Sequence, residues 1–224
     1  LTVMLTYNDM TVCNAHEIFE KCKNSSAEYW GFKEEPLARD EMKKLFAYMK
    51  ECGKKTVLEV VCYDEKNSLA GAYVAAECGC DYLMGTVFFD SVNEFCKAHN
   101  LKYLPFVGKL SERPSVLDGD IDDMIAEAKE YLEKGVYGID LLGYRYNGDA
   151  SKLIERFVNE VDAPVCVAGS VNSYERLDEI KKISPWSFTI GGAFFEKVFG
   201  EDFAEQINTV CDYMAENKEA ALVK

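Results

Sequence analysis

The sequence has few positively charged residues, and this shortage excludes some classes of binding partner. It has 25 Lys and Arg residues against 39 Asp and Glu, a net charge of −14 with both histidines neutral. Nucleic acids and anionic membrane surfaces are normally bound through basic faces, so we expect neither as a partner. A small anionic ligand stays compatible with this charge, because it responds to local groups and not to the net sign.

Several familiar segments and motifs are also missing. No apolar run approaches the roughly 18 residues that a membrane-spanning helix needs. The first nine residues have no basic region and no small-residue cleavage site, so we expect no signal peptide and a cytoplasmic location. The sequence has neither a Gly-x-Ser-x-Gly elbow nor a P-loop, which disfavours serine hydrolases and NTP hydrolases.

Cysteine, by contrast, is abundant, with nine residues. Without a secretory signal, reduced thiols are the expectation. Cys78 and Cys80 are one residue apart, which is neither zinc nor redox spacing. His16 and His99 have no partner ligand at metal spacing. We therefore expect buried thiols, no metal site and no cofactor, and a divalent metal has no support in the sequence.

The chain alternates short apolar runs with amphipathic segments. Only five prolines and no low-complexity stretch interrupt it, so we expect one domain over residues 1–224. Apolar residues at helical spacing are clearest over Asn14–Cys22, Glu41–Lys50 and Asp123–Glu133. The predicted strands are Thr2–Thr6, Ala27–Phe32, Thr56–Cys62, Asp81–Val87, Lys102–Val107, Val136–Leu142, Pro164–Ala168 and Ser187–Ile190.

This rhythm of eight strand-then-helix units predicts an α/β fold with parallel strands covered by helices. A closed (β/α)8 barrel needs about 200–250 residues and eight units, and the chain has both. An open doubly wound sheet carries a glycine fingerprint after its first strand. Here the first strand runs into Tyr7-Asn8-Asp9-Met10, without glycine. We therefore expect a (β/α)8 TIM barrel.

Two glycine turns follow the last two predicted strands. Gly169-Ser170 follows strand seven, and Gly191-Gly192 follows strand eight and leads into a short helix at Ala193. Glycine lets backbone N–H groups approach an anion, and a helix N-terminus adds partial positive charge. Loops seven and eight with a short helix are a frequent phosphate site in such barrels. The alternative is that these glycines only form tight turns.

At these residues the chain resembles the phosphate-binding TIM barrels of the ribulose-phosphate-binding superfamily, which include phosphosugar epimerases, decarboxylases and aldolases. The similar stretch runs from Val167-Ala168-Gly169-Ser170 to Ile190-Gly191-Gly192-Ala193-Phe194-Phe195-Glu196. The resemblance implies a phosphorylated small-molecule ligand and does not choose the reaction. It also implies phosphate contacts at Gly169, Ser170, Gly191, Gly192 and Ala193, with Gly143 after strand six as an additional loop.

Charged residues near the strand ends are the catalytic candidates, because barrel active sites lie at the C-terminal ends of the strands. Glu59 and Asp140 lie within apolar strands, where each is either a general base or half of a structural ion pair. Lys33 and Lys109 follow strands two and five. Each is a candidate general acid, oxyanion clamp or Schiff-base amine, or is a solvated rim lysine.

Local sequence ranks the two lysines. Glu34 and Glu35 directly follow Lys33 and favour its ammonium form, so Lys109, in a less acidic stretch, is the preferred amine. The decarboxylases of the superfamily carry an Asp, Lys, Asp signature along strand three. Here that strand reads Glu59-Val60-Val61-Cys62, which puts a magnesium-dependent decarboxylase in doubt.

Two further polar positions are candidates for substrate binding. Arg145 can clamp a carboxylate or a second phosphate, or form a loop ion pair. Asn8 and Asp9 can hydrogen-bond sugar hydroxyls, or Asp9 can cap the turn that follows strand one.

Taken together, these features predict a lyase or isomerase of carbohydrate metabolism acting on a phosphosugar or phospho-sugar acid. An epimerase or an aldolase would remove a proton next to a carbonyl, with Glu59 or Asp140 as the base. Lys109 or Arg145 would stabilise the enediolate oxygen. The alternatives are a non-catalytic phosphometabolite-binding barrel and an enzyme of phosphorylated-heterocycle biosynthesis, because the fold serves all three. A homodimer is compatible with the sequence.

Overall fold

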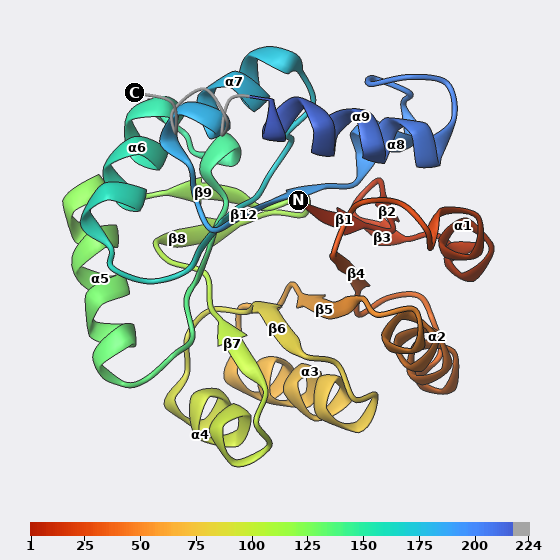
Figure 1. Ribbon diagram of the computed structural model, residues 1–224. Coiled ribbons are helices and arrows are strands. Elements are labelled where there is room, and N and C mark those ends of the chain that lie inside the picture. The colour runs from red at the N-terminus through yellow and green to blue at the C-terminus, as the bar shows by residue number, and fades with distance from the viewer. Residues whose placement is uncertain (217–224) are drawn as a thin grey trace.

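The computed structural model describes residues 1–216, which form a ring of parallel strands surrounded by helices (Figure 1). The strand order is β10-β11-β12-β1-β4-β5-β6-β7, with parallel pairing throughout. Between the two outermost strands, the Tyr137 N–H donates to the Tyr103 carbonyl at 2.9 Å and the Asp140 N–H donates to the Pro105 carbonyl at 3.0 Å. The barrel is therefore nearly closed, and the predicted (β/α)8 fold is confirmed.

All eight barrel strands lie where the alternation of the sequence predicts them. Most are shorter than predicted, because the ends of the apolar runs turn into loops. The strands are β1 (Thr2–Met4), β4 (Tyr29–Lys33), β5 (Lys55–Val60), β6 (Tyr82–Gly85), β7 (Lys102–Leu104), β10 (Ile139–Leu141), β11 (Val165–Val167) and β12 (Ser187–Ile190).

Most of the helices cover the outside of the barrel, each through one apolar face. None of the helices within residues 1–216 is long and apolar enough to cross a membrane. The α-helices are α1 (Ala15–Cys22), α2 (Arg39–Glu51), α3 (Glu65–Glu77), α4 (Asp90–Ala98), α5 (Ile121–Glu133), α6 (Ala150–Glu160), α7 (Tyr174–Ile183), α8 (Gly192–Phe195) and α9 (Phe203–Ala215).

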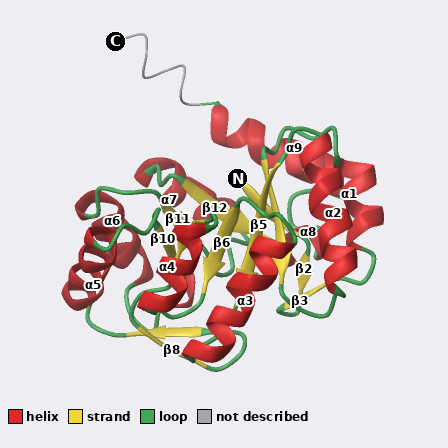
Figure 2. Ribbon diagram, turned by 90° about the horizontal axis from the view of Figure 1, so that it is seen from below, coloured by secondary structure: helices red, strands yellow, loops and turns green. Residues whose placement is uncertain are grey.

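Two short antiparallel hairpins stand at one end of the barrel (Figure 2), and the sequence analysis did not predict them. In one, β2 (Thr6–Tyr7) pairs with β3 (Met10–Thr11); in the other, β8 (Lys109–Ser111) pairs with β9 (Val116–Asp118). Strands β3, β8 and β9 do not lie within apolar runs as long as those that contain the three-residue barrel strands, so the sequence pattern did not reveal them. The hairpins follow β1 and β7, so they lie at the C-terminal end of the barrel.

Aromatic side chains fill the opposite, N-terminal end of the barrel. Tyr29, Tyr82, Tyr137 and Trp186 pack mainly at tilted or edge-to-face angles, with ring centroids 5.4 to 6.0 Å apart. Next to them the interior is filled by apolar side chains that point inward from four strands. These are Val57, Met84, Leu104 and Cys166.

The alternation of side chains along the strands brings charge into the other end of the barrel. Val57 points into the barrel interior, so Glu59, two residues further along β5, shares its face. Lys33 is the register partner of Glu59 on the neighbouring strand β4. The two side chains therefore lie next to each other at the C-terminal ends of their strands.

Gly71 marks a close approach of α3 to the barrel, which leads to a stability prediction. A Cβ at Gly71 would lie 2.4 Å from Cγ1 of Val60 on β5. Overpacking a core costs about 1–3 kcal/mol, whereas alanine gains about 1 kcal/mol over glycine in a helix. We expect Gly71→Ala to lower the free energy of unfolding by up to about 2 kcal/mol, measured by urea denaturation. In a Val60→Ala background, which lacks both methyl groups, the same change should cost less; an equal cost in both backgrounds would contradict this contact.

Candidate functional site

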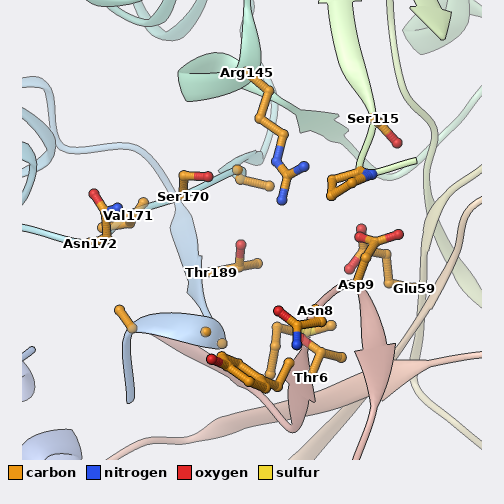
Figure 3. Close-up of a pocket in the computed structure, with 18 of the residues that line it drawn as sticks. Thr6, Asn8, Asp9, Glu59, Ser115, Arg145, Ser170, Val171, Asn172 and Thr189 are labelled. Atoms are coloured by element: carbon orange, nitrogen blue, oxygen red, sulfur yellow. The ribbon is translucent and has the colours of Figure 1, made fainter. Parts of the chain in front are cut away.

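A cavity of about 260 Å³ opens at the C-terminal end of the barrel strands (Figure 3). Loops that follow β1, β10, β11 and β12 contribute to its wall, as does the loop of the β8–β9 hairpin. This is the end at which barrel active sites are built.

A buried ion-pair cluster lies on one side of the cavity. Lys33 Nζ is 2.5 Å from Asp9 Oδ1 and 3.4 Å from Glu59 Oε1, and the three side chains are 9%, 6% and 11% exposed. Burial alone would lower the pKa of Lys33, but Glu59 and Asp9 outweigh burial, so its pKa lies above the ordinary value. Lys33 is therefore an ammonium ion at neutral pH.

Asp9 reaches Lys33 because the β2–β3 hairpin folds back over β4. Asn8 and Asp9 form its two-residue turn with φ of +49° and +64°, as the type I′ turn requires. Thr11 ties the hairpin to β4, because its Oγ1 accepts from the Lys33 N–H at 2.9 Å and donates to the Lys33 carbonyl at 2.8 Å. Ser170, across the cavity, also has a left-handed backbone, with φ of +59°. Such conformations are costly for non-glycine residues and cluster at functional sites.

Arg145 supplies a positive charge in the middle of the cavity. Figure 3 shows its side chain reaching inward from the loop after β10, between Ser170 and Ser115. Gly169 gives it room, because a Cβ there would lie 2.7 Å from the Arg145 Cγ. Among residues 1–216, no carboxylate forms an ion pair with this guanidinium. It is therefore available to an anionic ligand.

The two glycine turns face this same cavity. A Cβ at Gly191 would lie 2.6 Å from Thr6 Oγ1, so only glycine lets this turn approach the strand-one loop so closely. Gly192 opens α8 and has no atom closer than 4.0 Å to the position of a Cβ. Glu196, an exposed carboxylate after α8, lines the cavity beside the Gly191–Gly192 turn, where its negative charge would repel an anion.

The structure brings most of the sequence-predicted residues together at the cavity and separates the two lysines. Lys33 lines the cavity, whereas Lys109 is exposed on β8 and does not, because the chain after β7 continues into a hairpin. Gly143 also lies outside the cavity wall: a Cβ there would lie 2.5 Å from Ile154 Cγ1, so Gly143 serves the packing of α6. The predicted residues that line the cavity are Asn8, Lys33, Glu59, Arg145, Gly169, Ser170, Gly191, Gly192 and Ala193.

Asp140 lies in the barrel interior and does not line the cavity. It is 1% exposed, and neither carboxyl oxygen has a hydrogen-bond partner among residues 1–216. Burial raises its pKa well above the usual value, and the charge of Glu59 raises it further. A carboxyl group in this setting is neutral, since an unpaired buried carboxylate is too costly. Glu59 is therefore the only one of the two predicted bases that faces the cavity.

Two residues at the site, Arg113 and Ser115, were not predicted from the sequence. Arg113, in the loop of the β8–β9 hairpin, donates from Nε to Asp9 Oδ2 at 2.9 Å. Ser115, in the same loop, lines the cavity. Neither lies at the end of a barrel strand, and the two short strands around them gave no periodic signal. Only recognition of the hairpin turn could have drawn attention to this loop.

Thiols and acidic groups do not gather into a metal site in the part of the chain that is described. All nine cysteines are free, and most are buried or partly buried. No group of three or more His, Cys, Asp or Glu side chains within residues 1–216 is arranged to hold a metal ion.

The neutral state of Asp140 leads to a prediction about pH. Its pKa is higher in the folded chain than the usual 3.8, so between the two values the folded state binds one proton more than the unfolded state. The contribution of Asp140 to stability therefore falls as pH rises through that window. Asparagine is neutral at every pH, so Asp140→Asn should gain stability relative to the wild type from pH 4 upward, by at most about 1.4 kcal/mol per pH unit.

Urea denaturation between pH 4 and pH 8 measures this difference. The matched control is Asp123→Asn, at an exposed position on α5, for which the difference from the wild type should change little with pH. A flat difference for Asp140→Asn as well would mean that Asp140 is ionised in the folded protein.

Comparison with known proteins gives a likeness of fold. No family model and no curated protein matches the chain. Among solved structures, orotidine 5′-phosphate decarboxylase from Pyrococcus horikoshii OT3 is 14% identical with a TM-score of 0.69, covering 96% of this chain and 99% of that one. A structure described as native KDPGal is 13% identical with a TM-score of 0.72, covering 98% and 97%.

A third similar structure is a regulatory protein. The glycerol uptake operon antiterminator regulatory protein from Listeria monocytogenes is 14% identical with a TM-score of 0.57, covering 85% of this chain and 91% of that one. These likenesses show that the fold of this chain is that of a TIM barrel, with no specific family matched.

Proposed function

We propose that the chain is a lyase or isomerase that acts on a phosphosugar or phospho-sugar acid by removing a proton next to a carbonyl. One observation carries the proposal. The ammonium ion of Lys33 and the carboxylate of Glu59 lie side by side on one side of the cavity. The guanidinium of Arg145, which has no ion-pair partner among residues 1–216, reaches into its middle.

The Arg145 side of the cavity would bind the phosphate. Arg145 would pair with the phosphate oxygens, and the turns at Gly169–Ser170 and Gly191–Gly192 would offer backbone N–H groups. Neutral hydrogen-bonding side chains line the rest of the cavity and suit the hydroxyl groups of a sugar; they include Asn8, Ser115 and Thr189. Binding energy from the phosphate would offset the cost of positioning the reacting carbon.

Chemistry would take place beside Lys33. The Glu59 carboxylate would take the proton from the carbon next to the carbonyl, and the Lys33 ammonium would hydrogen-bond to the carbonyl oxygen as it becomes an enediolate. Asp9 would hold Lys33 in place and keep it charged. A Schiff base needs a neutral amine, so the charge on Lys33 favours enediolate chemistry.

A second candidate is a phosphometabolite-binding barrel without turnover. The similarity to an antiterminator regulatory protein favours it, because that structure shows the same type of fold in a regulatory protein. Both candidates use the Arg145 side of the cavity, and they differ in whether Glu59 moves a proton.

Proton exchange tests the catalytic proposal. We expect the protein to exchange the hydrogen next to the carbonyl of at least one sugar phosphate with ²H₂O, followed by proton NMR over a panel of ketose, aldose and sugar-acid phosphates. Glu59→Gln should slow this exchange by about 10²- to 10⁴-fold, the usual contribution of a general base. Lys109→Gln, at the exposed lysine outside the cavity, is the control and should exchange at the wild-type rate.

Binding without exchange, for every compound in the panel, would support the regulatory candidate. Equal exchange by the wild type and Glu59→Gln would remove Glu59 from the role of base.

Phosphate binding is tested separately from turnover. Inorganic phosphate should raise the melting temperature of the wild type, because a ligand that binds the folded state stabilises it. Arg145→Gln should weaken this binding by about tenfold or more, since it removes a charge-assisted contact. Glu196→Gln, which lines the same cavity, should tighten phosphate binding by about twofold to fivefold, because a negative surface charge that repels the anion is removed. Unchanged binding in Arg145→Gln would place the anion elsewhere.

A further inference from the structure

A second arginine lies on the outer side of the Lys33 cluster. Arg113 places Nε 2.9 Å from Asp9 Oδ2 and Nη2 3.5 Å from Glu34 Oε1. Figure 2 shows β8 and the β2–β3 pair at the same end of the barrel. Arg113 therefore connects two hairpins whose contact residues are 104 positions apart in the chain.

Both carboxylate oxygens of Asp9 are in use, one by each cation. Oδ1 contacts Lys33 and Oδ2 contacts Arg113. Two directional, charge-assisted contacts fix the rotation of a carboxylate, which a single contact leaves free. The orientation in which Asp9 holds Lys33 therefore depends on a residue outside the β2–β3 hairpin.

The loop that carries Arg113 is seated on the barrel by a second anchor. The Tyr63 hydroxyl lies 2.7 Å from Ser115 Oγ and donates to the Glu112 carbonyl at 2.9 Å. Pro114 and Ser115, which follow Arg113, line the cavity. When the loop is seated, it thus closes part of the cavity wall and presents Arg113 to Asp9 at the same time.

We propose that Arg113 is a positioning residue. Through Asp9 it holds the Lys33 ammonium beside Glu59, and it makes the β8–β9 hairpin part of the working site. The effect on catalysis rests on the proposed function, whereas the coupling between the two hairpins does not.

Hydrogen exchange of the intact protein measures the coupling without any substrate. In Arg113→Gln, amide exchange over residues 8–11 should rise by about fivefold, the effect of losing a partly exposed ion pair. Because coupling is reciprocal, Asp9→Asn should raise exchange over residues 111–115 by a similar factor. Over residues 111–115 the double variant should exchange no faster than Arg113→Gln alone, since Arg113→Gln already removes the contact with Asp9.

The control is Arg156→Gln, at an arginine that pairs with Asp122 and Glu160 far from the cavity. It should leave exchange in both hairpins unchanged. In every variant of the hairpins, exchange in α6 should keep its wild-type rate, because general loosening of the fold would raise it as well. Unchanged exchange over residues 8–11 in Arg113→Gln, or an equal rise in α6, would overturn the proposal.

Kinetics separate positioning from a purely structural role. With a sugar phosphate that exchanges, Arg113→Gln should lower kcat by about tenfold and leave KM within about twofold, because the reacting groups are displaced and the phosphate contacts are kept. Arg113→Lys should recover part of kcat, since lysine can contact Asp9 but cannot also span to Glu34.

An unchanged kcat in Arg113→Gln, or a loss confined to KM, would overturn the positioning role. If no compound exchanges, the proposed function fails, and hydrogen exchange alone decides whether Arg113 couples the two hairpins.

Discussion

A lysine ammonium inside a protein must be surrounded by opposite charge, and the site of this barrel is organised around that requirement for Lys33. Removing a charged group from water is costly unless carboxylates replace the lost hydration. Glu59 meets the requirement through strand register, because it pairs with Lys33 across β4 and β5. Asp9 meets it through the hairpin that folds back over β4. The left-handed turn at Asn8 and Asp9 is the local cost of that arrangement.

Electrostatic interactions also connect Lys33, on one side of the cavity, with Arg145 in its middle. Burial disfavours the charged form of Lys33. Glu59 and Asp9 favour the charged form and raise the pKa of Lys33, whereas Arg145 lowers this pKa slightly from across the cavity. A phosphate bound at Arg145 would neutralise that opposing charge. In the proposed mechanism, a phosphate bound at Arg145 would therefore raise the pKa of Lys33, although Arg145 and Lys33 have different tasks.

The sequence predicts the barrel well because its signals are local and repeated. Eight apolar runs at regular intervals are sufficient for the strands, and the glycine turns after the last two strands do line the cavity. The same alternation brings Glu59 and Lys33 inside the barrel. The ranking of Lys109 above Lys33 rested on the neighbours of Lys33 in sequence, Glu34 and Glu35; in the structure Lys33 lines the cavity and Lys109 does not. The partners that the structure shows are Asp9 and Glu59.

Other features depend on contacts that no local pattern contains. Asp140 lies in a strand just as Glu59 does, and only its depth in the barrel separates a neutral, enclosed carboxyl from one that faces the cavity. The contact between Arg113 and Asp9 joins loops that are distant in sequence and are carried by hairpins too short to show a period. Both features depend on the three-dimensional arrangement of the chain and cannot be predicted from local sequence.

The packed tyrosines and tryptophan at the N-terminal end of the barrel limit the routes by which a molecule could reach the cavity. These side chains fill the barrel at its N-terminal end, so any molecule that reaches Lys33 would enter and leave at the C-terminal end. Pro114 and Ser115 of the β8–β9 hairpin line that opening, so a molecule that enters or leaves would pass beside this hairpin.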